Sequence, residues 1–128
     1  ALRDGRGVIE ITLEAVEISA ERAATMRELH AGSHVRLAVR DTGQGMEDAI
    51  KARIFEPFFT TKPPGQGTGL GLSVVHGIVK SHEGAITVRT QPGAGTTFEV
   101  FLPVVAAGEL AEIRQRFAGH RGRGERVL

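Results

Sequence analysis

The sequence predicts a single domain of mixed α and β structure. Several runs alternate apolar and polar residues, which is typical of strands, and one long stretch repeats apolar residues at spacings of four, which is typical of a helix. With 128 residues, of which 41% are hydrophobic, the chain can bury one core of ordinary size and is too short for two.

Two strands are predicted in the first third of the chain. Residues 8–18 alternate, so we expect a half-buried strand with Ile9, Ile11 and Leu13 on its inner face. Residues 19–33 break the pattern and predict a polar connection with room for one helical turn. The second strand places three apolar residues inward and two arginines outward, and it ends at an aspartate; these residues are Val35, Leu37, Val39, Arg36, Arg40 and Asp41.

Two helices are predicted in the middle of the chain. Residues 47–55 have apolar residues at helical spacing, and Pro57 ends the helix because a residue before proline is pushed away from helical angles. After an irregular segment rich in proline and glycine, the longest helix begins at Gly69 and Gly84 is its predicted stop.

Two strands and a tail complete the prediction. The strands lie around residues 86–88 and 98–102, with a hairpin turn at 91–95 between them and Pro103 as the end of the sheet. Residues 108–118 have the apolar spacing of a connecting helix, and 119–124 form a basic linker.

Composition excludes several classes of protein. No apolar run is long enough to span a bilayer, and the first residues do not form a signal peptide. The chain is therefore expected to be cytoplasmic, which is compatible with a membrane anchor elsewhere in a parent protein. There is no cysteine for a disulfide framework. A net charge of +1 and the lack of Trp and Tyr argue against a nucleic-acid surface.

The run from Asp41 to Leu72 contains the residues that suggest chemistry. Asp41 follows a strand and precedes Gly43 and Gly45, so its carboxylate is held beside backbone that a ligand can approach, and it could accept a hydrogen bond from an exocyclic amine. The alternative is structural, because aspartate often starts a turn by bonding to the backbone two residues on.

A second glycine group opens the longest predicted helix. Gly67, Gly69 and Gly71 lie where free N–H groups and the helix dipole can bind phosphate. A dinucleotide fingerprint is the alternative, but position 72 is Leu where that pattern requires a third glycine, and no strand comes directly before it.

An aromatic and basic segment lies between these two glycine groups. Phe55, Phe58 and Phe59 are either core residues or the anchor of a mobile lid whose Lys62 reaches a terminal phosphate. The five histidines have no metal-ligand spacing, and no nucleophile motif is present.

In this order, the three elements resemble the ATP-binding domain of sensor histidine kinases, within the superfamily that includes DNA gyrase B, a class of chaperones and mismatch-repair proteins. The motifs specific to the histidine-kinase branch are Phe-Glu-Pro-Phe-Phe-Thr-Thr-Lys at 55–62 and Gly-Thr-Gly-Leu-Gly-Leu at 67–72. The resemblance covers about residues 7–103. It implies an α/β (α+β) two-layer sandwich of the Bergerat type, with a mixed, mostly antiparallel sheet, helices on one face, and the nucleotide between helices and lid.

The resemblance also implies a nucleotide-binding set. Asp41 would bond the adenine amine, Lys62 would contact a phosphate, and Thr96 would support the adenine site through Asp41 or a water. The full set is Asp41, Gly43, Gly45, Met46, Phe58, Phe59, Thr60, Thr61, Lys62, Gly67, Thr68, Gly69, Leu70, Gly71, Leu72 and Thr96.

The sequence departs from the family in two places. The asparagine box, whose helix supplies the Mg²⁺-binding Asn, is not found, and residues 1–5 resemble the tail of that helix. The phospho-accepting histidine and its helical hairpin are not found either. We therefore expect ATP and Mg²⁺ as ligands, no catalytic residue within the chain, and a metal ligand upstream of Ala1.

These features predict a parent protein that is an ATP-dependent protein histidine kinase of a two-component phosphorelay, of the hybrid type in which a receiver domain follows. Residues 1–104 would be its ATP-binding domain, and 105–128 a linker helix and the lead-in to a response-regulator receiver domain after Leu128. The expected partners are that receiver and a histidine-containing dimerisation domain of the same homodimeric protein. The chain alone is expected to be inactive as a kinase and to self-associate. The alternatives are a non-catalytic nucleotide-sensing or docking module and a related protein serine kinase.

Overall fold

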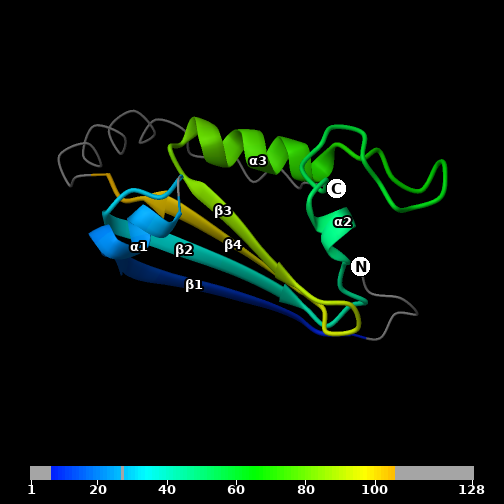
Figure 1. Cartoon of the computed structure of the whole chain (residues 1–128), viewed down its shortest axis with the longest axis horizontal. Coiled ribbons are helices and arrows are strands. Elements are labelled where there is room, and N and C mark those ends of the chain that lie inside the picture. Colours follow the sequence, from blue (N-terminus) through cyan, green and yellow to red (C-terminus); the bar gives the residue numbers. More distant parts are fainter. Residues whose placement is uncertain (1–6, 27, 106–128) are drawn as a thin grey trace, which may run out of the picture.

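A computed structural model of the chain describes residues 7–26 and 28–105. Four strands and three helices follow one another as β1 (Ile9–Ile18), α1 (Ala20–Thr25), β2 (Gly32–Asp41), α2 (Asp48–Lys51), α3 (Gly71–Ser81), β3 (Ala85–Thr90) and β4 (Thr96–Pro103). The strands form one sheet in the order β1-β2-β4-β3, and every neighbouring pair is antiparallel. Figure 1 shows α1 at one end of this sheet, and α2 with the long loop that follows it at the other.

The predicted α+β fold is confirmed, with a sheet that is antiparallel throughout the described residues. α3 packs on the face that carries Val35 and Leu102, which are paired in the register of β2 and β4. The side chains of Val79 and Leu102 converge there, because a Cβ placed on Gly84 would lie within 3.0 Å of both. Helix and sheet thus form the two layers that the resemblance implies.

The best-buried cluster lies on the opposite face, which the alternating pattern assigned to solvent. Its core consists of Ile18, Leu29, Ala85 and Phe101, packed against Val16, Ala23 and Met26. α1 and the segment after it supply the cover, and α1 starts at Ser19, whose hydroxyl accepts from the Arg22 N–H at 3.2 Å. The inward and outward assignment of the strands was therefore wrong at this end of the sheet, because the polar connection folds over a face that looked exposed.

The prediction that β1 is half-buried was also wrong for most of the strand. Ile9, Ile11 and Leu13 are 59%, 66% and 68% exposed. They belong to an edge strand, on the same face as α3, and Val74 and Ile78 of α3 are each 55% exposed. Within residues 7–26 and 28–105, α3 covers only the β3 side of this face, which leaves an apolar surface open along β1.

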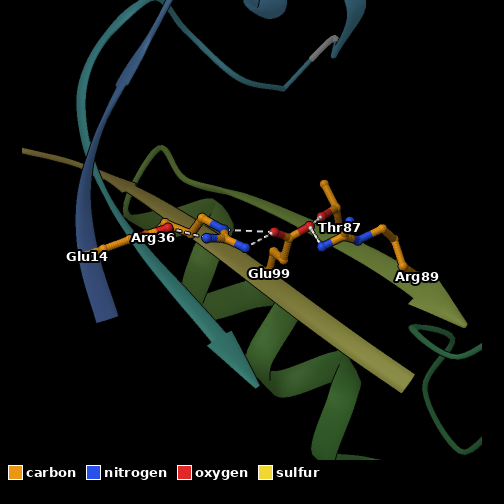
Figure 2. Close-up of polar contacts among 5 residues, drawn as sticks. All are labelled: Glu14, Arg36, Thr87, Arg89 and Glu99. Carbon is orange, nitrogen blue, oxygen red and sulfur yellow. Dashed lines mark hydrogen bonds and ion pairs between the residues drawn. The ribbon is translucent and has the colours of Figure 1, made fainter. Parts of the chain in front are cut away.

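Polar side chains cross the other face of the sheet, beyond the apolar cluster (Figure 2). Glu99 of β4 is 7% exposed and accepts from Arg36 Nε at 2.7 Å, while Arg89 Nη2 lies 3.2 Å from its second oxygen. Arg36 also pairs with Glu14 of β1. Hydrogen bonds from Arg36 to Glu99 and then to Glu14 raise the pKa of Arg36, so its guanidinium stays charged and links three strands.

The helix ends differ from prediction by a few residues. α2 has only four residues and continues as turns, and α3 begins at Gly71 instead of Gly69. At the end of α3 the left-handed residue is Glu83, with a φ of 56°, and not Gly84. The helix tail predicted at 1–5, the connecting helix at 108–118, the basic linker at 119–124 and the lead-in to a receiver domain before Leu128 lie outside the described residues.

Candidate functional site

Asp41 lies at the last position of β2, as predicted. Its Oδ1 atom accepts a hydrogen bond from the Gly43 N–H at 2.7 Å, so the carboxylate does start a turn. A carboxylate has a second oxygen with its own lone pairs, and a ligand amine can bond to it without disturbing this turn. The turn is therefore compatible with the predicted ligand role.

Gly45 is required by packing of the chain on itself. It has a φ of 68°, and a Cβ added there would lie 1.8 Å from the Gln91 carbonyl oxygen. The adjacent Gln44 carbonyl accepts from the Gly93 N–H at 2.7 Å. The loop after β2 is thus held against the β3–β4 turn, a reason for glycine different from the ligand approach that the resemblance suggests.

Thr96 pairs with Asp41 in the register of β2 and β4 and is 6% exposed. The hydrogen bond that the structure describes for its hydroxyl runs to Thr90 Oγ1, at 3.0 Å, and not to Asp41. Sequence reasoning missed Thr90, which also accepts from the Met46 N–H at 2.9 Å. A threonine at the end of a strand is ordinary, and its partner lies 44 residues away, so the pattern held no signal for it.

The predicted lid is a loop closed by Phe58 and Gly69. The Phe58 N–H donates to the Gly69 carbonyl at 2.9 Å, and both residues have a φ of 66°. A Cβ on Gly69 would lie 2.4 Å from the Phe58 carbonyl carbon, so only glycine fits. Residues 60–68 between them are exposed, including Lys62, whose N–H donates to Thr60 Oγ1 at 3.1 Å.

The three phenylalanines of this region differ in burial. Phe55 is half-buried, with its ring 5.0 Å from that of His76, and Phe59 is half-buried under the guanidinium of Arg53 at 4.4 Å. Phe58 is 74% exposed at the base of the lid. Phe55 and Phe59 thus anchor the segment, and Phe58 is left facing solvent.

The start of α3 offers open N–H groups. Leu70 is its N-cap and no side chain caps it, and the first helical bond is from the Val74 N–H to the Leu70 carbonyl. Apart from the adjacent residues and the backbone of α3 itself, no atom of residues 7–26 and 28–105 lies within 4 Å of a Cβ added at Gly71, so these residues leave the space beside the first turn open. Open N–H groups at a helix start bind anions such as phosphate.

The predicted residues form two groups at one end of the molecule (Figure 1). Asp41, Gly43, Gly45, Met46 and Thr96 lie together around the ends of β2 and β4. The second group runs from Phe58 to Leu72 and contains Phe58, Phe59, Thr60, Thr61, Lys62, Gly67, Thr68, Gly69, Leu70, Gly71 and Leu72. Within the described part of the chain, no hydrogen bond or ion pair joins the two groups.

Two hollows flank the first group. One of about 500 Å³ is bordered by Met46, Lys51, Thr90 and Pro92. Another of about 440 Å³ lies on the polar face around Arg36, and none of the predicted nucleotide residues lines it. Of these two hollows, the one beside Met46 is the one that borders a predicted nucleotide residue.

Two other features are lacking in the described part of the chain. No group of three or more His, Asp or Glu side chains among residues 7–26 and 28–105 could hold a metal ion. No helix over the same residues is long and apolar enough to cross a membrane.

Comparisons with known proteins agree with this geometry. The family described as "Histidine kinase-, DNA gyrase B-, and HSP90-like ATPase" matches residues 1–106. Sensor kinase CckA of Brucella abortus is 48% identical over 96 residues, which are 73% of this chain and 10% of CckA. Sensor histidine kinase ZraS of Escherichia coli K12 is 49% identical over 74 residues, 58% of this chain and 16% of ZraS. The chain thus spans a small part of the curated relatives that it matches.

Solved structures show the same fold. The mycobacterial sensor histidine kinase MprB superposes with a TM-score of 0.56 at 27% identity, covering 76% of this chain and 56% of that one. Full-length ShkA in complex with AMPPNP gives a TM-score of 0.51 at 38% identity, over 58% of this chain and 15% of ShkA. The chain belongs to the histidine kinase-, DNA gyrase B- and HSP90-like ATPase family, as a histidine-kinase-type ATP-binding domain.

Proposed function

We propose that this chain binds Mg-ATP and presents the γ-phosphate to a histidine on a separate dimerisation hairpin of the same protein. The observation that supports this most is the position of Asp41, at the end of β2 and beside the Met46 loop, in a chain of this family. In the reaction, the histidine nitrogen forms a bond to the γ-phosphorus as the bond to the bridging oxygen breaks and ADP leaves.

The residues of the chain contribute by positioning and charge. Asp41 selects the nucleobase through an exocyclic amine, and the open N–H groups at the start of α3 hold phosphate oxygens. Lys62, on the exposed loop closed by Phe58 and Gly69, reaches the terminal phosphate when that loop folds over the nucleotide. The remaining predicted residues line the path between these contacts.

The described residues do not fit Mg²⁺ on their own, since they contain no cluster of metal ligands. We propose that its ligand is an asparagine upstream of Ala1 and that the acceptor histidine is also outside this chain. The chain alone then labels nothing with γ-phosphate. The proposed parent is a cytoplasmic or membrane-anchored homodimer with a response-regulator receiver as its partner, and residues 1–104 form the ATP-binding domain.

Replacement of Asp41 by asparagine, in the protein extended upstream of Ala1, tests the proposal. The carbonyl oxygen of the new side chain can still accept from the Gly43 N–H, so the turn is kept while the charge is lost. A hydrogen bond to a charged group contributes about 1.5 to 3 kcal/mol, so ATP affinity should fall by roughly tenfold to a hundredfold. Calorimetry with ATP and GTP measures this loss and the change in base preference.

This titration, together with a phosphotransfer assay, separates the alternatives. Unchanged affinity and unchanged base preference in Asp41→Asn would overturn the adenine assignment. ATP binding without γ-phosphate transfer to any histidine of the extended protein would favour a nucleotide-sensing module. Transfer to a serine of a partner protein would favour a serine kinase.

A further inference from the structure

Thr90 joins the loop after β2, through the Met46 N–H, to the end of the sheet. It is the last residue of β3 and pairs with Thr96, the first residue of β4, which in turn pairs with Asp41 at the end of β2. The three side chains therefore form one row across three strand ends, on the face of the sheet that carries α3. Of these three residues, Asp41 is the one that the resemblance places in direct contact with the base.

The hydroxyl of Thr90 has a full set of partners. Its oxygen accepts from the Met46 N–H at 2.9 Å, it donates to the Gly95 carbonyl at 3.1 Å, and it lies 3.0 Å from Thr96 Oγ1. A hydroxyl has one proton and two lone pairs. Because the carbonyl of Gly95 can only accept, its bond to Thr90 uses the one proton of Thr90. When all three bonds are formed together, Thr96 is the donor in the bond between the two hydroxyls.

This arrangement fixes the direction in which the Thr96 hydroxyl donates its hydrogen bond. Its proton points to Thr90, so the lone pairs of its oxygen remain as acceptors beside Asp41, the residue opposite in the register. The row then offers acceptors only: a carboxylate oxygen of Asp41 and the hydroxyl oxygen of Thr96. When the 6-position of a purine meets this row, such a site favours the amine that adenine has there and disfavours the carbonyl that guanine has there.

The bonds of Thr90 also hold tightly packed backbone. A Cβ on Gly95 would lie 2.0 Å from the Asp41 carbonyl oxygen, and one on Gly45 would lie 1.8 Å from the Gln91 carbonyl oxygen. The β3–β4 turn and the loop after β2 thus touch backbone to backbone on both sides of Thr90. Loss of its hydroxyl would leave the Met46 N–H without this partner at the contact between the two loops.

We propose that Thr90 is a positioning residue that sets the adenine preference of the site, by holding the Met46 loop and by directing the proton of Thr96 away from the base. This inference rests on the proposed nucleotide-binding function. It assigns Thr90 no contact with the nucleotide. Its effect should appear in base selectivity more than in phosphate binding.

The test compares Thr90→Val with Thr90→Ser in the protein extended upstream of Ala1, by calorimetric titration with ATP and GTP. In Thr90→Val the proton of Thr96 is released and can donate to the carbonyl of guanine. We expect ATP affinity to fall roughly fivefold to thirtyfold and the ratio of ATP to GTP affinity to fall with it, as expected for one or two lost hydrogen bonds. Thr90→Ser keeps the hydroxyl and should retain both.

Thr87→Val is the matched control, since Thr87 lies on the same strand but on the polar face, where its hydroxyl is 3.4 Å from Glu99. It should leave base selectivity unchanged. If Thr90→Val does not fold, which thermal unfolding reveals, Thr90→Ala removes the hydroxyl without adding atoms and takes its place.

The outcomes separate the two proposals. An unsubstituted protein that prefers ATP and a valine variant that keeps this preference would overturn the role of Thr90 alone. Equal selectivity loss in Thr90→Ser or in Thr87→Val would also overturn it, because the hydroxyl or its location would then not matter. An unsubstituted protein without any adenine preference would overturn the proposed function, and the role of Thr90 with it.

Discussion

Phe58 and Gly69 close the base of the lid loop with one backbone hydrogen bond of 2.9 Å, and both have the left-handed φ of 66°. The left-handed region costs an ordinary residue roughly 1 to 2 kcal/mol, whereas glycine enters it freely. The hydrogen bond to Gly69 thus holds Phe58 in an unfavourable backbone conformation. Substitution should therefore be costly at Gly69 and nearly neutral at Phe58.

Gly69→Ala should open the base of the lid, because its Cβ would meet the Phe58 carbonyl carbon at 2.4 Å. We expect a loss of roughly 1 to 3 kcal/mol in the free energy of unfolding and weaker ATP binding. Phe58→Gly should change stability by less than about 1 kcal/mol, since relief of strain is offset by chain entropy. Chemical denaturation of the two variants measures the contrast, and equal losses would contradict it.

Lys62→Ala should reduce affinity for ATP more than for ADP. The lysine is exposed on the lid loop, and its proposed contact is the terminal phosphate, which ADP lacks. Calorimetry with both nucleotides in the extended protein gives the ratio of the two losses. Lys51→Ala, on α2 beside the hollow near Met46, is a control that should not favour one nucleotide over the other. If Lys62→Ala weakens both nucleotides equally, Lys62 is only a surface charge.

Glu99→Gln should destabilise the fold although Glu99 lies on the opposite face of the sheet from Asp41 and Thr96. The carboxylate is 7% exposed and bonded to Arg36, with Arg89 and Thr87 at its second oxygen (Figure 2). The amide oxygen of glutamine can still accept from Arg36, but the bond loses its charge and Glu14 is left as the acidic partner of a partly desolvated guanidinium, a loss of roughly 1 to 3 kcal/mol. Glu10→Gln on the exposed part of β1 should stay within about 0.5 kcal/mol.

The effect of Glu99→Gln should not depend on pH through Arg36. Hydrogen bonds to the two glutamates raise the pKa of Arg36 in the folded protein. A group whose pKa is raised by folding adds its full contribution to the free energy of unfolding below its unfolded pKa. That contribution is lost only as the pH rises through the pKa of the folded state. For an arginine this lies above the range of ordinary buffers. Urea denaturation at neutral and mildly alkaline pH should therefore give the same difference between Glu99→Gln and the unsubstituted protein.

The strands and the candidate site could be predicted where the signal was local. The alternating run that ends at Asp41 and the glycines that follow define both β2 and the turn. The buried face could not be predicted, because α1 is a six-residue helix whose cover of Phe101 depends on contacts far apart in the sequence. Thr90 was missed for the same reason, since it bonds to backbone N–H and carbonyl groups that carry no side-chain signature.

The open apolar surface on the α3 face of the sheet predicts that the chain self-associates. Ile9, Ile11 and Leu13 lie on the sheet face that carries α3, and Val74 and Ile78 belong to α3 itself; all five are more than half exposed. Apolar surface in water is unfavourable by about 25 cal/mol per Å², so a patch of several hundred Å² costs on the order of 10 kcal/mol. We expect the 128-residue chain to self-associate through this surface.

Light scattering over a range of concentrations measures this association. Ile11→Thr combined with Ile78→Thr should shift the chain toward monomer, because it removes apolar area from both sides of the patch while keeping β-branched side chains. Thr12→Val with Thr87→Val, on the opposite face, is the matched control and should leave association unchanged. The rival outcome is that the segment with Leu110, Ile113 and Phe117 covers the patch within one chain, and deletion of 108–128 would then induce association. A chain that stays monomeric at high concentration both with and without 108–128 would contradict both forms of the prediction.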